Sequence, residues 1–188
     1  MPKNIVLLSE GTGNSAAKFN HTNVWRTYEA LDLSDPAKQI AYYDDGVGTS
    51  TFRPLALLGG AFGIGISRNV RELYVFLCRH YEVGDRIYGF GFSRGAFSMR
   101  LLVGFVAFSG ILKKTEYSGE DDLWKKVTWL YRIYRKNHSK QGDDPVFARI
   151  IRAIRDSLPG QSFGRHPPPK IAFHQPDIQF MVLIFTQN

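Results

Sequence analysis

The sequence predicts an α/β domain with three layers and a mainly parallel sheet. Short apolar segments alternate along its 188 residues with amphipathic segments of helical period, an order typical of parallel strands connected by helices. Hydrophobic residues make up 44% of the chain and charged residues 22%, which is the composition of a folded protein with one core. A serine flanked by glycines stands where one predicted strand meets the next helix, and it is the strongest candidate for chemistry.

The N-terminal part predicts two strands joined by a helix. A buried parallel strand is expected in "NIVLLSEG", an apolar run that ends in glycine, and a second strand in "QIAYYDDGVG". Between them, Thr22 can cap a helix over residues 23–32, whose apolar side chains fall on one face. Strand, helix and strand in this order form the first crossover of a parallel sheet.

The middle of the chain predicts a second crossover. Residues 52–67 are rich in Gly and Leu without a clear period, so an apolar loop or a distorted helix is expected there. A helix follows from Ser67 to Tyr81, in which apolar residues recur at helical spacing and form a buried stripe. The third strand is expected over residues 86–92, and a helix is expected after Ser93, ending at about Phe108.

The C-terminal part predicts a helical insertion at about residues 115–160 within a single domain that spans residues 1–188. One amphipathic helix is expected over residues 119–136, and a second begins with Asp144 as its N-cap. A proline-rich connection then leads to a fourth strand over residues 177–185. The insertion interrupts the alternation of strands and helices without ending the sheet.

Net charge and cysteine content restrict the classes of function. The 24 Lys and Arg against 17 Asp and Glu give a net charge of +7, which favours contact with phosphates, nucleic acid or anionic membranes. The excess is concentrated at residues 125–140 and 149–156, where solvated helix faces explain it, so no specific nucleic-acid partner is expected. Nucleic-acid binding stays open as an alternative that rests on charge alone. Cys78, the only cysteine, excludes an intrachain disulfide and a cysteine-rich zinc site.

No targeting or membrane-spanning segment is expected. The first residues contain only four consecutive apolar positions, too few for the core of a Sec signal peptide. The longest weakly polar runs, at residues 54–66 and 101–113, are shorter than the roughly 20 residues that span a bilayer. A cytoplasmic location is therefore expected, although secretion without a signal peptide stays open.

Ser93 stands at the centre of "GFGFSRGAF", between the third predicted strand and the helix after it. A nucleophile at such a turn needs very small residues two positions before and two after it, and Gly91 and Gly95 meet this demand. The helix start also brings backbone amides and a partial positive charge to the place where an oxyanion would form. The alternative is that the glycines only permit tight packing and that Ser93 caps the helix.

Two other motifs compete with the serine site. The stretch "GGAFGIGIS" precedes a helix, but it fits neither the dinucleotide fingerprint nor the Walker pattern of phosphate-binding loops. Asp44 and Asp45 stand together at a strand end, where paired carboxylates could bind a metal, but a turn explains them more simply. No cofactor and no metal are therefore expected.

Five stretches, in their order and spacing, carry a resemblance to a known family: "SEGTGNS", "TNV", "YYDDGVGT", "GISRNVRELYVFL" and "GDRIYGFGFSRGAF". Together they resemble the uncharacterised α/β-hydrolase domain family that includes phospholipase effectors of type VI secretion. The resemblance covers nearly the whole chain. It implies an α/β-hydrolase-like fold, a serine esterase or lipase with a Ser-Asp-His triad, a lipid or small ester as substrate, and transient contact with a membrane surface.

The resemblance also implies roles for individual residues. Ser93 corresponds to the nucleophile, and the glycines beside it to the nucleophile elbow. The backbone amide of Arg94 corresponds to one oxyanion donor, and the second would come from the loop of Gly11, Thr12 and the residues after them. Glu10 stands where the family usually has Asp, which makes the side chain one methylene longer in a tight loop.

The C-terminal end departs from the family pattern. In the family the last matching strand leads into Trp-Asp-Thr, which supplies the triad Asp, and the His comes later, whereas this sequence reads "MVLIFTQN". An incomplete fold is therefore expected, the N-terminal portion of a hydrolase and nearly inactive as this chain. His166 and His174 are the alternatives for a base, although neither follows a predicted strand.

A hypothesis of another class is a non-catalytic interaction module, the remnant of a hydrolase. Its support in the sequence is the missing triad Asp and His. In either case the apolar last strand would leave an open edge of the sheet, which predicts self-association.

Overall fold

The computed structural model describes residues 2–11, 22–45, 61–138, 172–174, 176 and 182–184. Its main sheet has the strand order β2-β1-β3-β6, and every pair of neighbours in it is parallel. The strands are β1 (Asn4–Ser9), β2 (Gln39–Asp44), β3 (Arg86–Gly91) and β6 (Val182–Ile184). The predicted parallel sheet is confirmed, and its strands lie within the predicted ranges.

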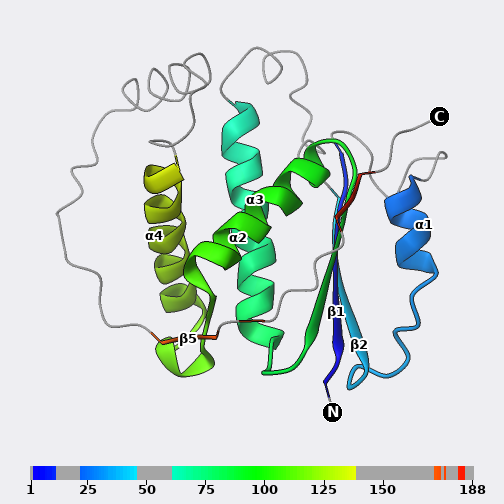
Figure 1. Cartoon of the computed structure of the whole chain (residues 1–188), viewed down its shortest axis with the longest axis horizontal. Coiled ribbons are helices and arrows are strands. Elements are labelled where there is room, and N and C mark those ends of the chain that lie inside the picture. The colour runs from blue at the N-terminus through cyan, green and yellow to red at the C-terminus, as the bar shows by residue number, and fades with distance from the viewer. Residues whose placement is uncertain are drawn as a thin grey trace.

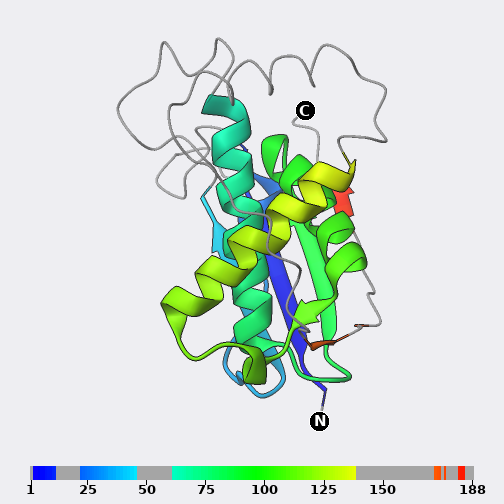
Figure 2. The ribbon, with the colours of Figure 1, turned by 90° about the vertical axis from the view of Figure 1, so that its left-hand side faces the viewer.

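The helices form layers on both sides of this sheet (Figure 1). On one side lies α1 (Asn23–Glu29). On the other side lie α2 (Ala61–His80) and α3 (Arg94–Ser109), and α4 (Glu120–His138) packs against them from outside (Figures 1 and 2). The three-layer α/β arrangement predicted from the sequence is confirmed.

Strand β1 lies in the middle of the core, which explains why its sequence is a continuous apolar run. Ile5 and Leu7 belong to the large cluster that also contains the buried residues of α2, α3 and α4. Val6 and Leu8 belong to the smaller cluster with Val24 of α1. Because successive side chains of a strand point to opposite faces, a strand covered on both faces needs apolar residues at every position.

Two helix boundaries differ from the prediction. Helix α1 has the predicted N-cap, since the hydroxyl oxygen of Thr22 accepts a hydrogen bond from the backbone N–H of Trp25 at 3.2 Å, but it ends at Glu29. Helix α2 begins at Ala61, six residues before the predicted start at Ser67, so the loop alternative for residues 52–67 is wrong from Ala61 onward and the helical alternative holds there. Burial of Ile66 in the core outweighs the low helix propensity of the glycines there. Residues 52–60 lie outside the described residues.

The described part of the C-terminal region contains α4 and a small second sheet. In that sheet β4 (Ile111–Leu112) pairs antiparallel with β5 (Phe173–His174). Neither strand was predicted, because two residues are too few for a periodic pattern. A 3₁₀ turn, Lys114–Glu116, follows β4.

The second helix of the predicted insertion, from Asp144, lies outside the described residues, and so do residues 177–181 of the predicted last strand. No helix in the described ranges is long and apolar enough to cross a bilayer.

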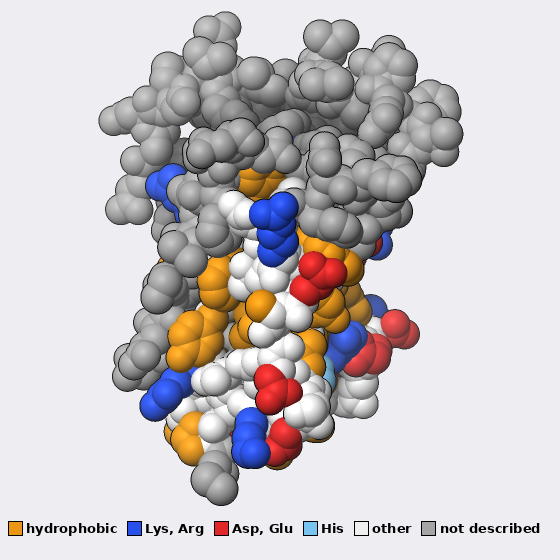
Figure 3. Space-filling view, turned by 90° about the vertical axis from the view of Figure 1, so that its right-hand side faces the viewer, with side chains coloured by type: hydrophobic (Ala, Val, Ile, Leu, Met, Phe, Trp, Pro, Cys, Tyr) orange, Lys and Arg blue, Asp and Glu red, His pale blue; other side chains and the backbone are white. Residues whose placement is uncertain are grey.

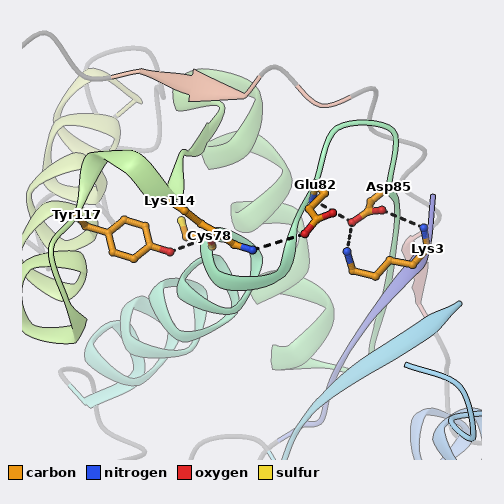
Figure 4. Close-up of polar contacts among 6 residues, drawn as sticks. All are labelled: Lys3, Cys78, Glu82, Asp85, Lys114 and Tyr117. Carbon is orange, nitrogen blue, oxygen red and sulfur yellow. Dashed lines mark hydrogen bonds and ion pairs between the residues drawn. The ribbon is translucent and has the colours of Figure 1, made fainter. Parts of the chain in front are cut away.

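A buried carboxylate holds the turn that leads into β3 (Figure 4). Asp85 is only 5% exposed, and its oxygens accept hydrogen bonds from the Lys3 backbone N–H at 2.9 Å, the Lys3 Nζ and the Glu82 N–H at 3.0 Å. Burial by itself would raise the pKa of the Asp85 carboxyl, but the hydrogen bonds from Lys3 and Glu82 outweigh it, so this pKa lies below its ordinary value. The turn thereby ties the start of β3 to the start of β1.

Helix α3 comes so close to the sheet at its N-terminal end that only glycine fits. A Cβ added to Gly95 would lie 2.0 Å from the backbone oxygen of Ser9 in β1. A Cβ added to Gly91 would lie 2.5 Å from the backbone nitrogen of Ala96 in α3. Both neighbours are backbone atoms, which cannot move aside as the end of a side chain can.

We expect Gly95→Ala to lower the free energy of unfolding by about 3 kcal/mol or more, because α3 must shift away from β1 to make room for the methyl group. Gly119→Ala is the matched control, since a Cβ at Gly119 meets nothing within 4 Å. Denaturant unfolding of both variants measures the difference. Equal stability of the two variants would contradict the close contact.

We expect Asp85→Asn to lower the free energy of unfolding at neutral pH by about 1–3 kcal/mol, through the loss of hydrogen bonds to a charged group. Because the folded-state pKa of Asp85 is depressed, its contribution is present above the unfolded pKa of about 3.9 and is lost as the pH falls through the lower folded pKa. The difference between wild type and variant should therefore shrink below about pH 4. Unfolding curves across this range test it, with the exposed Asp121→Asn as control.

Candidate active site

Ser93 lies at the junction of β3 and α3 with a strained backbone. Its φ of 52° and ψ of −116° make it the one non-glycine with a positive φ among the described residues. Such a conformation costs on the order of 1–3 kcal/mol and persists only where the surroundings impose it. The Ser93 side chain is exposed and makes no capping hydrogen bond to α3. The structure thus does not use Ser93 as the side-chain cap of the helix, which was the alternative explanation for a serine at this position.

The surroundings that impose this backbone are the two glycine contacts already described. The backbone N–H of Gly95 donates to the carbonyl of Phe92 at 2.8 Å, so the chain turns from strand to helix within two residues. Gly91 and Gly95 lie on either side of this turn, at the close contacts with α3 and β1. The turn raises the serine hydroxyl above the carboxyl end of the sheet, where ligands of parallel α/β domains bind.

Gly11 lies directly beside the serine. It is buried, and a Cβ added to it would lie 3.1 Å from Cβ of Ser93 and 3.0 Å from Cδ1 of Phe92. The start of the predicted oxyanion loop is therefore next to the serine. Arg94 is the first residue of α3, so its backbone amide belongs to the helix end that carries a partial positive charge. Thr12 lies outside the described residues.

Glu10 fits into the core despite its extra methylene. Its side chain is 1% exposed, and its Oε1 accepts hydrogen bonds from the Thr22 hydroxyl and from the Tyr43 hydroxyl, the latter at 3.0 Å. Its Oε2 has no hydrogen-bond partner within the part of the chain that the structure describes. Burial first, and the Glu10 charge second, raise the pKa of the Tyr43 hydroxyl. Glu10 thus links the end of β1 to α1 and β2.

Asp44 takes part in a polar contact that the sequence did not reveal. Its Oδ2 accepts hydrogen bonds from the Ser9 hydroxyl at 2.8 Å and from Nδ2 of Asn69 at 2.6 Å. Asp45, its neighbour, is exposed. Within the described ranges no three His, Cys, Asp or Glu side chains come together in a way that could hold a metal ion. The sequence contained one signal for the Asp44 contact. Ser9 and Asn69 are polar residues at positions that the strand and helix patterns predict to be buried.

The two histidines of the described regions with placed side chains lie far from the serine. The ring of His80 packs on the ring of Phe76 with 4.4 Å between the ring centroids, and the ring of His174 packs on that of Tyr81 with 5.6 Å between the centroids. Tyr81 follows the end of α2 and precedes β3, whereas the serine follows β3, so the length of that strand, roughly 20 Å, separates them. Figure 1 shows β5, which carries His174, at the end of the molecule opposite the start of α3.

His174 was one of the two alternatives for a base. Burial, and then the nearby Lys113 and Lys114, lower its pKa. Its position confirms the expectation that it lies at the wrong end of the sheet to reach Ser93. His166, the other alternative, lies outside the described residues.

Charged side chains do not single out a nucleic-acid interface. On the face that carries α1, basic and acidic side chains are interspersed (Figure 3). The described part of the basic stretch, residues 125–138, lies on α4 in the opposite layer, where Lys126 pairs with Asp122 at 2.9 Å. The described residues therefore give the nucleic-acid alternative no support beyond the net charge.

Comparisons with known proteins identify the family of the chain. The chain matches a model of the catalytic domain of the Tle1-like phospholipase effectors of type VI secretion over residues 3–173. It is 33% identical over 147 residues to an uncharacterised protein of Saccharomyces cerevisiae, YEL023C, in a match that covers 71% of this chain and 20% of that protein. The chain thus spans about a fifth of the length of this curated relative. No solved structure matches. Because the family model covers most of the sequence, the chain belongs to the family of Tle1-like phospholipase effector catalytic domains.

Proposed function

We propose that Ser93 is the nucleophile of a serine hydrolase that cleaves ester bonds in phospholipids. The observation that carries the proposal is the positive φ of Ser93 at the β3–α3 junction, enclosed by two glycines that no larger residue could replace. Proteins rarely keep such strain without a use for it, and strained residues cluster at active sites. Membership of a phospholipase family supports lipid as the substrate class.

The chemistry would follow the two steps of covalent catalysis. The Ser93 oxygen attacks the ester carbonyl, its proton passes to a general base, and the carbonyl oxygen becomes an oxyanion. Backbone amides of Arg94 and of the loop that begins at Gly11 would stabilise that oxyanion. The intermediate then expels the alcohol, which takes up the proton, and leaves an acyl-serine. Water hydrolyses this ester and releases the fatty acid.

Neither of the two described histidines with a placed side chain lies where a general base for Ser93 would have to stand. His80 and His174 both lie beyond the far end of β3. Without a base the serine hydroxyl is protonated at neutral pH, and loss of triad members lowers turnover by about a million-fold, leaving roughly a thousand-fold over water. We therefore infer that this chain by itself reacts slowly, and that an added base should accelerate the reaction.

We make two further predictions about partners, namely contact with a membrane surface and self-association. Contact with a membrane surface would bring the enzyme to its lipid substrate. Self-association would use β6, which stands at the end of the described sheet and pairs only with β3 there.

We expect a fluorophosphonate probe to label the chain slowly at Ser93 and faster when imidazole is added, because imidazole can take the serine proton in place of a bound base. Mass spectrometry of the labelled peptide identifies the residue. Ser93→Ala should lose the label, whereas Ser118→Ala, at an exposed surface serine, should keep it. Unchanged labelling of Ser93→Ala, or no labelling even with imidazole, would refute the proposal and favour a non-catalytic interaction module.

We expect His174→Ala to leave the rate of Ser93 labelling within about twofold of wild type, since His174 contacts Tyr81 at the other end of the fold. The same assay, with and without imidazole, measures the rate. A large loss of labelling that imidazole restores would show instead that His174 acts as the base.

A further inference from the structure

The end of strand β1 is the point at which the nucleophile turn is fixed to the rest of the fold. Ser9 is fully buried and lies in register with Asp44 of β2 on one side and with Gly91 of β3 on the other. Its backbone oxygen accepts a hydrogen bond from the N–H of Phe92 at 3.1 Å. The same oxygen is the atom that α3 touches at Gly95. Any movement of Ser9 is therefore passed to both sides of the turn.

The side chain of Ser9 is held in turn by Asp44. Its hydroxyl donates to Oδ2 of Asp44 at 2.8 Å, and Nδ2 of Asn69 donates to the same oxygen at 2.6 Å. Asn69 is 6% exposed and belongs to α2, which packs against α3. We call Ser9, Asp44 and Asn69 the brace. It joins β1, β2 and α2 directly behind the turn that carries the serine.

The charge of Asp44 also acts on the residue after the nucleophile. The guanidinium of Arg94 is half-buried; burial lowers its pKa, and the negative charge of Asp44 counteracts part of that shift. Arg94 is also the first residue of α3. That residue is the one whose backbone amide would face the oxyanion.

We propose that Asp44 is a positioning residue of the active site, which through the brace fixes the Ser93 oxygen and the Arg94 amide in the geometry for attack. This inference rests on the proposed function of Ser93. It gives a reason for a polar cluster at a position where an apolar contact would serve packing equally well. A misplacement of about 1 Å at a reacting centre costs roughly a hundred-fold in rate.

Geometry distinguishes Asp44 from its neighbour in the "YYDDGVGT" stretch. Asp44 is the last residue of β2 and its carboxylate points to the Ser9 hydroxyl, whereas Asp45 is exposed. The two residues carry the same charge and adjoin in sequence, so they form a matched pair. Asp44→Asn keeps the size of the side chain but puts a neutral amide against the two donors of the brace.

The test compares Asp44→Asn with Asp45→Asn in the full chain. For each variant, the rate of Ser93 labelling by a fluorophosphonate is measured against probe concentration, with imidazole present. We expect Asp44→Asn to lower the maximal labelling rate by about 10- to 100-fold with little change in the half-saturating probe concentration. Asp45→Asn should match the wild type. Such a split between rate and binding is not expected of a residue that only supports the fold.

A second measurement does not depend on activity. In the isotopically labelled chain, Asp44→Asn should shift the backbone amide signals of Ser93 and Arg94, while Asp45→Asn should leave them in place. If Asp44→Asn does not fold, Asn69→Ala removes one donor and leaves the carboxylate. It should then produce the same changes to a smaller extent.

Wild-type labelling rates and unmoved amide signals in Asp44→Asn would overturn the inference. A fall in labelling equal to that of Asp45→Asn would overturn it as well, because both would then act through surface charge. If labelling of the wild type does not depend on Ser93, the proposed function fails instead, and the amide signals alone decide whether the brace fixes the turn.

Discussion

The close approach of Gly95 to the backbone oxygen of Ser9, which leaves no room for a Cβ, sets the geometry at the carboxyl end of the sheet. With α3 this close to β1, the chain has only Phe92 and Ser93 in which to change from strand to helix. A turn this short forces a positive φ onto Ser93. The same contact places the helix N-terminus, with its partial positive charge, over the end of β1. The exposed position of the Ser93 hydroxyl and that of the backbone amides at the start of α3 therefore both result from this one close contact.

The polar side chains at this end of the sheet are tied to that constraint. Glu10 follows the central strand β1 and is buried, and Asp44 ends the neighbouring strand β2 and is partly buried, so a carboxylate without partners would be costly at either position. Hydrogen bonds from Thr22 and Tyr43 to Glu10, and from Ser9 and Asn69 to Asp44, offset this cost. At the opposite end of the sheet, the buried carboxylate of Asp85 accepts the hydrogen bonds that hold the turn into β3. Polar groups thus concentrate at the two ends of strands whose middle sections are apolar.

A nucleophile turn and its base are set by different parts of an α/β fold. The turn is a local unit, because one strand, one helix and their contact with the neighbouring strand complete it. Acid and base come from the ends of later strands, so their placement depends on how the rest of the sheet is assembled. This explains how a chain that spans about a fifth of its yeast relative can contain the strand-to-helix turn at Ser93 with its two close glycine contacts. Of the described histidines with placed side chains, His80 lies exposed at the end of α2 with its ring against Phe76, and His174 lies in β5 of the second sheet.

Much of the fold could be predicted from the sequence, because strands, helices and the glycine-serine turn are set by local patterns. The apolar run of β1, the cap at Thr22 and the spacing of Gly91, Ser93 and Gly95 each lie within a few residues. The features that only the tertiary structure decided are contacts between residues that are far apart in the sequence. The brace joins residues that are 35 and 25 positions apart, and β4 (Ile111–Leu112) pairs with β5 (Phe173–His174), which follows much later in the chain. The early start of α2, before Ser67, likewise brings Ile66 into the core, although glycines have a weak helix preference.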